Sequence, residues 1–258
     1  MNGERRDDVL HTHELTVWRF VLNDLLTNGF VVQENDTGAL AIVDPGARSD
    51  DLIAAAEEWG GDVRAILVTH LHGDHCAEVG KVKAAFEAAE VVAPPGGPFE
   101  VDRPMAGGET LEFGARTIQP CATPGHSPES LSYEIGPHVF VGDFLFRLGS
   151  GRTDGPGAST EDLFETVREV FLDMPDDTIL WCGHGPPSTV GEERENNPFW
   201  RIAREGSPGG PVDEVAYRGK AVPVLAWADD YDGGRKALIE LSDGGRVIVP
   251  GSQVDRTG

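Results

Sequence analysis

Short apolar runs alternate with turn residues and amphipathic segments along the first part of the chain. Residues 30–44 (FVVQENDTGALAIVD) contain two apolar runs separated by Asn-Asp-Thr-Gly, which predicts a β-hairpin. Ser49 can cap a helix through DLIAAAEEW, which a Gly-Gly pair ends, and AILVT at residues 65–69 is typical of a short buried strand. We therefore expect a hairpin, a helix and a strand in succession.

The same alternation continues to about residue 205. Residues 76–90 have helical composition, and another helix is expected from Ser159 or Thr160 to Leu172, with acids in its first turn, where the helix dipole favours them. Further strands are expected at residues 91–93, 130–135, 139–142 and 178–182. Strands and helices that alternate in this way predict an α/β fold.

The pattern changes near residue 205. Residues 205–211 (EGSPGGP) are rich in Gly and Pro and predict a linker. The β-type runs AVPVLAWA, KALIEL and RVIVP follow, joined by DDYDGGR and SDGGR, and they predict a small β-meander. We expect a main domain at residues 1–205 and a small β-rich C-terminal extension at residues 206–258, whose role the sequence does not indicate.

The composition is strongly acidic. Asp and Glu number 44 against 21 Lys and Arg, and the formal charge of −23 argues against a nucleic-acid-binding surface and against polyanionic partners. Only four of the basic residues are lysines. This pairing predicts a halophilic cytosol, in which salt screens the surface carboxylates; a base-composition bias toward Arg is the alternative.

Cysteine use and the N-terminal residues bear on location. Cys76, Cys121 and Cys182 are odd in number and form no CxxC pair, which predicts a reduced, intracellular protein. The N-terminal residues MNGERRDDVL lack the apolar core of a signal peptide, and no run approaches the ~18 apolar residues of a spanning helix. We expect a soluble, cytoplasmic protein with no membrane partner.

Three of the eight histidines stand within six residues, in THLHGDH at residues 69–75. His70 and His72 lie at i and i+2 of an extended segment, so they point to the same side and can share one metal, while Asp74 and His75 turn toward a neighbouring position. Three more ligand-type side chains each follow a predicted strand, where open α/β folds gather their active-site loops. They are His126 in TPGHSP, Asp143 in HVFVGD and His184 after TILWCG. We interpret the set as a two-metal site.

These residues, with Asp44 in VDPG, resemble the metallo-β-lactamase superfamily over roughly residues 15–200. Within it, GRTDGPGAS (residues 151–159) and GHGPPSTVGEERENNPFWR (residues 183–201) are similar to glyoxalase II-like hydroxyacylglutathione hydrolases, which hydrolyse thioesters. The resemblance implies an αβ/βα four-layer sandwich with two metals at one edge. It implies that Asp44 orders the ligand loop. It also implies the ligands: His70, His72 and His126 for metal 1, Asp74, His75 and His184 for metal 2, and Asp143 as the bridge.

The implied enzyme is a dinuclear metal-dependent hydrolase. A water that bridges two divalent metals has its pKa lowered toward ~7, and the resulting hydroxide would attack the thioester carbonyl, oriented by Asp74 as the catalytic residue. A thiolate leaves readily because the pKa of a thiol is only ~8.5. Imidazole and carboxylate ligands accommodate zinc, iron or manganese, of which we expect zinc.

The substrate side of the resemblance is less complete. Glyoxalase II carries a C-terminal helical domain whose basic residues hold the glutathione carboxylates; here Arg201 and Arg204 in NPFWRIAR are expected to bind substrate, with surface ion pairing as the alternative. The chain then continues into the predicted linker and β-meander, which leaves the thiol carrier open. We expect a small-molecule thioester substrate, and the oligomeric state, a homo-oligomer included, stays open.

The sequence leaves two alternative functions open. FRLGSGRTD (residues 146–154) also resembles persulfide dioxygenases, which share the fold but use one iron, and such an oxidoreductase is the alternative function. A non-catalytic protein with the C-terminal β-unit as its binding module is a third. His11, His13 and His138 match no ligand position and are interpreted as surface or packing residues, and Cys76 and Cys182 as small buried hydrophobes.

Overall fold

The computed structural model describes residues 8–206 and 209–256. The chain divides into two compact units. Unit 1 comprises residues 1–122 and 131–142, and unit 2 comprises residues 123–130 and 143–258. In the described part of the chain, no helix has both the length and the apolar character needed to cross a membrane.

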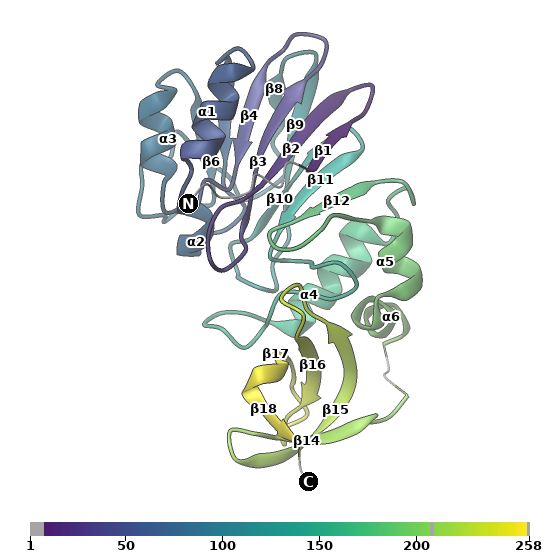
Figure 1. The fold of residues 1–258 in the computed structure, drawn as a ribbon. Helices are drawn as coiled ribbons and strands as arrows, with labels where there is room; N and C mark the ends of the chain where they lie inside the picture. The colour runs from purple at the N-terminus through teal and green to yellow at the C-terminus, as the bar shows by residue number, and fades with distance from the viewer. Residues whose placement is uncertain (1–7, 207–208, 257–258) are drawn as a thin grey trace. The chain divides into compact units, whose positions relative to one another are not determined.

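Unit 1 is built on a seven-stranded sheet whose strands follow one another in chain order (Figure 1). The first four strands pair antiparallel, and the pairs from β4 to β7 are parallel. Parallel neighbours need crossover connections: α1 lies in the connection from β4 to β5, α2 and α3 lie in the one from β5 to β6, and a loop connects β6 to β7. The strands are β1 (Asp8–His11), β2 (Leu15–Val21), β3 (Asn28–Glu34), β4 (Leu40–Val43), β5 (Val63–Leu67), β6 (Glu90–Ala93) and β7 (Arg103–Pro104). The helices are α1 (Asp50–Glu58), α2 (Gly73–Cys76) and α3 (Val79–Ala85).

Helices α1 and α3 lie side by side against the sheet of unit 1 (Figure 1), over a core of apolar side chains from strands and helices. Four further strands of unit 1 pair antiparallel in the order β8 (Leu111–Phe113), β9 (Arg116–Ala122), β10 (Leu131–Ile135) and β11 (His138–Gly142). They pack on the seven-stranded sheet: the buried Tyr133 hydroxyl donates to the carbonyl of Val68 at 2.8 Å, and the rings of Phe30 and Phe140 meet edge to face. These contacts bring the ends of β5 and β10 together inside unit 1.

Unit 2 begins with helical elements around a short hairpin. The elements are α4 (Thr160–Thr166), a π-helical turn (Val167–Phe171), β12 (Ile179–Cys182), β13 (Ser188–Thr189), α5 (Val190–Asn196) and α6 (Pro198–Glu205). The three α-helices have side-chain N-caps, from Ser159, Thr189 and Asn197, and α6 places Pro198 at its first position, where the missing amide costs nothing.

A five-stranded antiparallel sheet completes unit 2 (Figure 1). Its order is β17 (Arg246–Pro250), β16 (Arg235–Glu240), β15 (Lys220–Asp229), β14 (Asp213–Tyr217) and β18 (Val254–Arg256). The sheet is joined to the rest of unit 2 by Arg246, which forms two hydrogen bonds with Glu161 of α4, and by two hydrogen bonds between Thr153 and Ile248. The predicted β-meander is therefore confirmed as the strands β15 to β17.

Most of the elements predicted from the pattern are present, with two corrections. The helix expected over residues 76–90 is wrong as one element, because the chain forms α2, a break at Ala77 and Glu78, and then α3. The cap expected of Ser49 is also wrong: its hydroxyl donates to the Gly46 carbonyl at 2.6 Å and accepts no amide of α1. The predicted linker includes residues 207–208, which lie outside the described residues. The domain boundary at residue 205 stays a prediction.

Candidate metal centre

The histidine loop of unit 1 lies directly after β5. His70 and His72 stand in the loop, and Asp74 and His75 lie in the one-turn helix α2. His70 and His75 are buried, Asp74 is half-buried and His72 is exposed. Nε2 of His70 lies 3.1 Å from Nδ1 of His72. Two nitrogens bound tetrahedrally to one zinc at ~2.0–2.1 Å are about 3.4 Å apart, so this pair has nearly the spacing of two ligands of one metal.

Asp44 orders this loop, as the resemblance implies. It follows β4 with a left-handed φ of 50° and is almost completely buried. Its Oδ1 accepts the backbone amide of Thr69 at 2.8 Å, and its Oδ2 accepts the Thr69 hydroxyl at 2.8 Å and lies 3.0 Å from Nδ1 of His75. One carboxylate thereby holds both the start of the loop and one of its histidines.

These hydrogen bonds determine which ring nitrogens carry protons. Because the Thr69 hydroxyl donates to Asp44, its oxygen accepts from Nδ1 of His70 at 3.1 Å. Nδ1 of His75 donates to the Asp44 carboxylate. In a neutral imidazole the second nitrogen then carries a lone pair, so Nε2 of both histidines has the form that binds a metal. The Nε2 lone pair of His75 faces Oδ2 of Asp74 at 3.5 Å.

Two further contacts within unit 1 complete the loop. The hydroxyl of buried Thr27 donates to Oδ2 of Asp74 at 2.9 Å. Gly46 lies so close to the Asp74 carbonyl that a Cβ at this position would overlap the oxygen. The turn VDPG therefore needs glycine here for the close approach of two backbone segments. Sequence reasoning missed Thr27, since no motif or spacing connects it with the histidine loop.

In unit 2, Asp143 lies between two histidines. Nε2 of His126 is 3.6 Å from Oδ2 of Asp143, and Nε2 of His184 is 3.4 Å from Oδ1. Nδ1 of His126 lies 2.9 Å from the carbonyl oxygen of Arg152, to which it donates. The Nε2 lone pair of His126 therefore faces a carboxylate oxygen, and two such acceptors are compatible at this distance when a cation lies between them.

The residue types fit divalent metals, and so do the tautomers of His70, His75 and His126, in which Nδ1 donates a hydrogen bond and Nε2 carries a lone pair. Among the described residues, seven His and Asp side chains stand in groups that could hold a metal ion, and all seven are candidate ligands predicted from the sequence. The structure brings His70, His72, Asp74 and His75 together in unit 1, and His126, Asp143 and His184 together in unit 2. Imidazole nitrogens and carboxylate oxygens are ligands common to zinc, iron and manganese. The division of the seven among two metals stays a prediction.

Three buried side chains, Cys76, Cys182 and His138, belong to neither group of candidate metal ligands. Burial, helped by the charges of Asp44 and Asp74, raises the pKa of Cys76 to about 11, so this thiol stays protonated and is a poor nucleophile. Cys182 is buried as well. His138 is fully buried in β11, where burial lowers its pKa to about 4 and keeps the ring neutral, as expected of a packing residue.

The arginines expected to bind substrate lie on α6. Both are exposed, and Arg204 donates to the carbonyl of Arg194 at 3.2 Å and to Glu205 at 3.3 Å. A substrate role for Arg201 and Arg204 stays a prediction. The same stretch of sequence contains a buried network that sequence reasoning missed: Asn197 donates to Glu193 and to the Gly149 carbonyl, and its Oδ1 accepts the first amides of α6.

Comparison with known proteins gives one family. The model of the metallo-beta-lactamase superfamily matches residues 22–184, a range that contains all seven ligand-type side chains. The hydroxyacylglutathione hydrolase GloC of Haemophilus influenzae is 31% identical over 188 residues, which cover 64% of this chain and 89% of that protein.

The chain is also similar to solved structures, which include a metallo-beta-lactamase. The BLEG-1 B3 metallo-beta-lactamase is 30% identical with a TM-score of 0.64, over 71% of this chain and 99% of that chain. ETHE1 from Myxococcus xanthus is 26% identical with a TM-score of 0.63, over 69% and 85%. TTHA1623, solved in a di-iron-bound form, is 31% identical with a TM-score of 0.60, over 70% and 98%.

Proposed function

The chain belongs to the metallo-β-lactamase superfamily, and on that premise we propose that it is a hydrolase that uses two divalent metals to cleave the thioester of a small thiol. The metallo-β-lactamase fold with a C-terminal β-rich sheet, expected from the sequence, is confirmed. The observation that carries metal dependence is the orientation of His126, whose Nε2 lone pair faces the Asp143 carboxylate. The thioester class is supported by the similarity to GloC.

The proposed ligand assignment follows the family resemblance. One metal would be held by His70, His72 and His126, and the other by Asp74, His75 and His184, with Asp143 shared between them. Zinc is our proposal for both positions, although a related structure holds two irons. When bound, two such cations would lower the pKa of a bound water to ~7 and polarise the scissile carbonyl.

The protein's own residues supply orientation. The Asp44 carboxylate and the Thr69 hydroxyl hold His70 and His75 in the tautomer that ligates through Nε2. Thr27 holds the carboxylate of Asp74, the residue proposed to orient the nucleophile. No general acid is required, because a leaving thiolate with a conjugate thiol pKa of ~8.5 departs without a proton.

The proposed substrate is a small-molecule thioester, bound with the help of Arg201 and Arg204. Glutathione is one carrier that exposed arginines would suit, because guanidinium groups bind carboxylates through paired hydrogen bonds. We further propose, on the composition alone, that the protein is cytoplasmic and that the cytosol around it is rich in salt.

The test is release of thiol from S-D-lactoylglutathione by the zinc-loaded protein in high salt. Asp74→Asn should abolish release, and Asp51→Asn, which changes an exposed acid of α1, should leave it intact. No release by the wild-type protein, with two zinc ions bound, would contradict the glutathione thioester. Oxygen consumption with a persulfide by iron-loaded protein would then favour the dioxygenase alternative that FRLGSGRTD suggests.

A further inference from the structure

The turn between β15 and β16 contacts a candidate ligand within unit 2. The Tyr231 ring stacks on the imidazole of His184, with 4.4 Å between ring centroids and 19° between planes. The Phe146 ring meets both of them edge on, at 5.4 Å from His184 and 4.9 Å from Tyr231. A stacked ring and an edge-on ring together restrict rotation of the imidazole. The C-terminal sheet therefore bears directly on His184.

The turn that carries Tyr231 is held by two acidic side chains. Asp230 accepts the Tyr231 amide at 2.9 Å through one oxygen and pairs with Lys236 at 2.5 Å through the other. This ion pair is buried, with 7% of the Asp230 side chain and 5% of the Lys236 side chain exposed. Asp232 accepts the Gly234 amide at 2.8 Å. Buried ion pairs add little net stability but can impose one conformation, here that of the turn.

Contacts from the rest of unit 2 keep the turn in place. The ammonium of Lys236 lies 4.7 Å from the centre of the Phe146 ring, close enough for a cation–π interaction. Gly185, next to the candidate ligand, has a left-handed φ of 75°, and a Cβ there would lie 3.0 Å from Cβ of Tyr231. The backbone beside His184 is thus shaped to admit Tyr231.

We propose that Tyr231 is a positioning residue of the metal centre, whose ring holds the imidazole of His184 in its ligating orientation. The C-terminal sheet then contributes to the centre instead of acting as a separate binding module. The family model ends at residue 184, so Tyr231 lies outside the matched range. The proposal rests on the proposed function to the extent that His184 must hold a metal.

The experiment compares Tyr231→Ala with Tyr231→Phe in the full chain. Zinc affinity is measured by competition with a chromophoric chelator, and the ligand geometry by the absorption spectrum of cobalt-substituted protein. Loss of the ring should weaken the more loosely bound zinc by about tenfold or more, the usual effect of removing a group that orients a ligand, and should change the cobalt spectrum. Tyr231→Phe keeps the stacked ring and should restore both.

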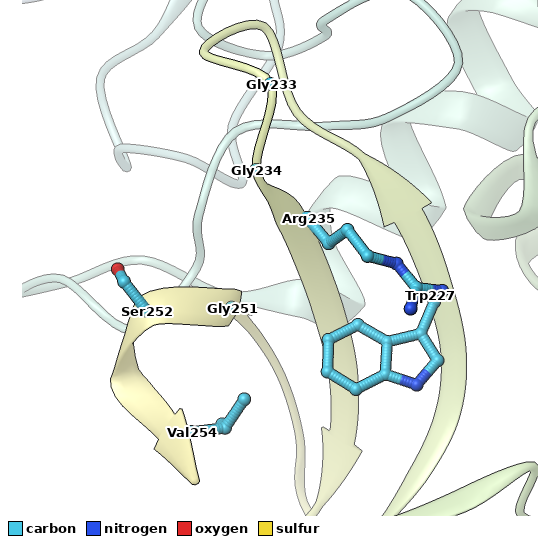
Figure 2. A pocket seen from close by; sticks show the side chains of 7 residues that line it. All are labelled: Trp227, Gly233, Gly234, Arg235, Gly251, Ser252 and Val254. Carbon is cyan, nitrogen blue, oxygen red and sulfur yellow. The ribbon is translucent and has the colours of Figure 1, made fainter. Parts of the chain in front are cut away.

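The control variant comes from the same hairpin. Trp227 of β15 stacks under the guanidinium of Arg235 at 4.5 Å, beside an open cavity of about 370 Å³ (Figure 2). The cavity is also lined by Gly233, Gly234, Gly251, Ser252 and Val254. Trp227→Ala removes an aromatic ring from β15 and leaves the Tyr231 stack in place. Zinc affinity should be unchanged; an equal loss in this variant would assign the effect to a loosened sheet and overturn the proposal.

The outcomes separate this proposal from the function on which it rests. A wild-type protein that binds none of zinc, iron and manganese would remove the proposed function. A wild-type protein that binds two zinc ions, with the same affinity in Tyr231→Ala, would overturn the role of Tyr231 and leave the function standing. If the Ala variant does not fold, Tyr231→Leu, which keeps the bulk without an aromatic ring, gives the same comparison.

Discussion

The hydroxyl of Thr27 donates to Oδ2 of Asp74 at 2.9 Å, across 47 positions of the chain. Thr27 is fully buried where the β2–β3 turn closes, and Asn23 accepts its amide at 3.3 Å and so holds the turn. The hydrogen bond reaches the carboxylate that we propose to orient the nucleophile. A residue of a plain hairpin turn therefore supports the centre of the site.

Thr27→Val should lower kcat and leave KM nearly unchanged, because it removes the hydroxyl and keeps the shape of the side chain. A hydrogen bond to a charged group contributes about 1.5–3 kcal/mol, so a decrease of roughly tenfold or more is expected. Thr27→Ser keeps the hydroxyl and should recover most of the rate. Steady-state thioester hydrolysis at matched zinc content measures both; a Val variant as fast as the wild type would remove this role from Thr27.

Asp44→Asn should weaken metal binding by about 10- to 100-fold, the range found when a group that orients a metal ligand is removed. The amide offers one acceptor oxygen, whereas Asp44 uses both oxygens to accept Thr69 and His75. Its NH₂ group would face one of these donors. Equilibrium dialysis against zinc with metal analysis gives the affinity. Asp51→Asn again serves as the control, and equal affinities in the two variants would contradict the prediction.

The candidate ligands could be picked out from the sequence by the spacing of residues 69–75 and by the position of three further ligand-type side chains beyond strands. Asp143 and His184 come just after β11 and β12, which match the strands expected at residues 139–142 and 178–182, and His126 follows β9, a strand missing from the expected elements. The residues that orient the ligands could not be predicted in this way. Thr27 and Tyr231 reach Asp74 and His184 through packing that spans 47 positions in each case, and neither lies in a motif.

The break between α2 and α3 shows why local pattern failed at residues 76–90. The composition favours one helix, but the amide of Glu78 donates to the carbonyl of Pro45 at 3.0 Å, and its carboxylate accepts the amide of Ser49 at 2.7 Å. Both bonds join the start of α3 to the loop after β4. These tertiary hydrogen bonds take the place of the hydrogen bonds that a continuous helix would make at Glu78, and they hold the VDPG turn next to α2, the helix that carries Asp74 and His75.

Stability should increase with salt, because a formal charge of −23 opposes folding when it is unscreened. The Debye length falls from ~10 Å at 0.1 M to ~3 Å at 1 M, which removes most of the repulsion between surface carboxylates. We expect Tm to rise by roughly 5 °C or more between 0.1 and 2 M KCl, about 2 kcal/mol for a chain of this size. Thermal unfolding in KCl, with sucrose at equal osmolality for comparison, distinguishes charge screening from general solute exclusion; a flat profile in KCl would contradict it.

Glu193 of α5 is a fully buried acid that belongs to neither group of candidate ligands. Burial, the largest cause, raises the pKa of Glu193 to about 7, although hydrogen bonds from Ser188, the Leu148 amide and Asn197 favour the charged form. The protonated side chain is therefore the more stable form in the folded protein up to that pH. In the unfolded chain the same carboxyl has its ordinary pKa of 4.5.

The free energy of unfolding should consequently fall as the pH rises from about 4.5 through about 7, because the folded protein alone keeps the proton of Glu193 in that window. The shift corresponds to a loss on the order of 3 kcal/mol, complete above the folded pKa. Glu193→Gln cannot titrate, so its stability relative to the wild type should improve over the same window. Urea unfolding followed by tryptophan fluorescence at pH 5 and pH 8, in constant high salt, measures this difference. Glu195→Gln, an exposed acid on the same helix, should show no such change. A constant difference between wild type and Glu193→Gln at the two pH values would mean that the buried carboxyl is charged throughout.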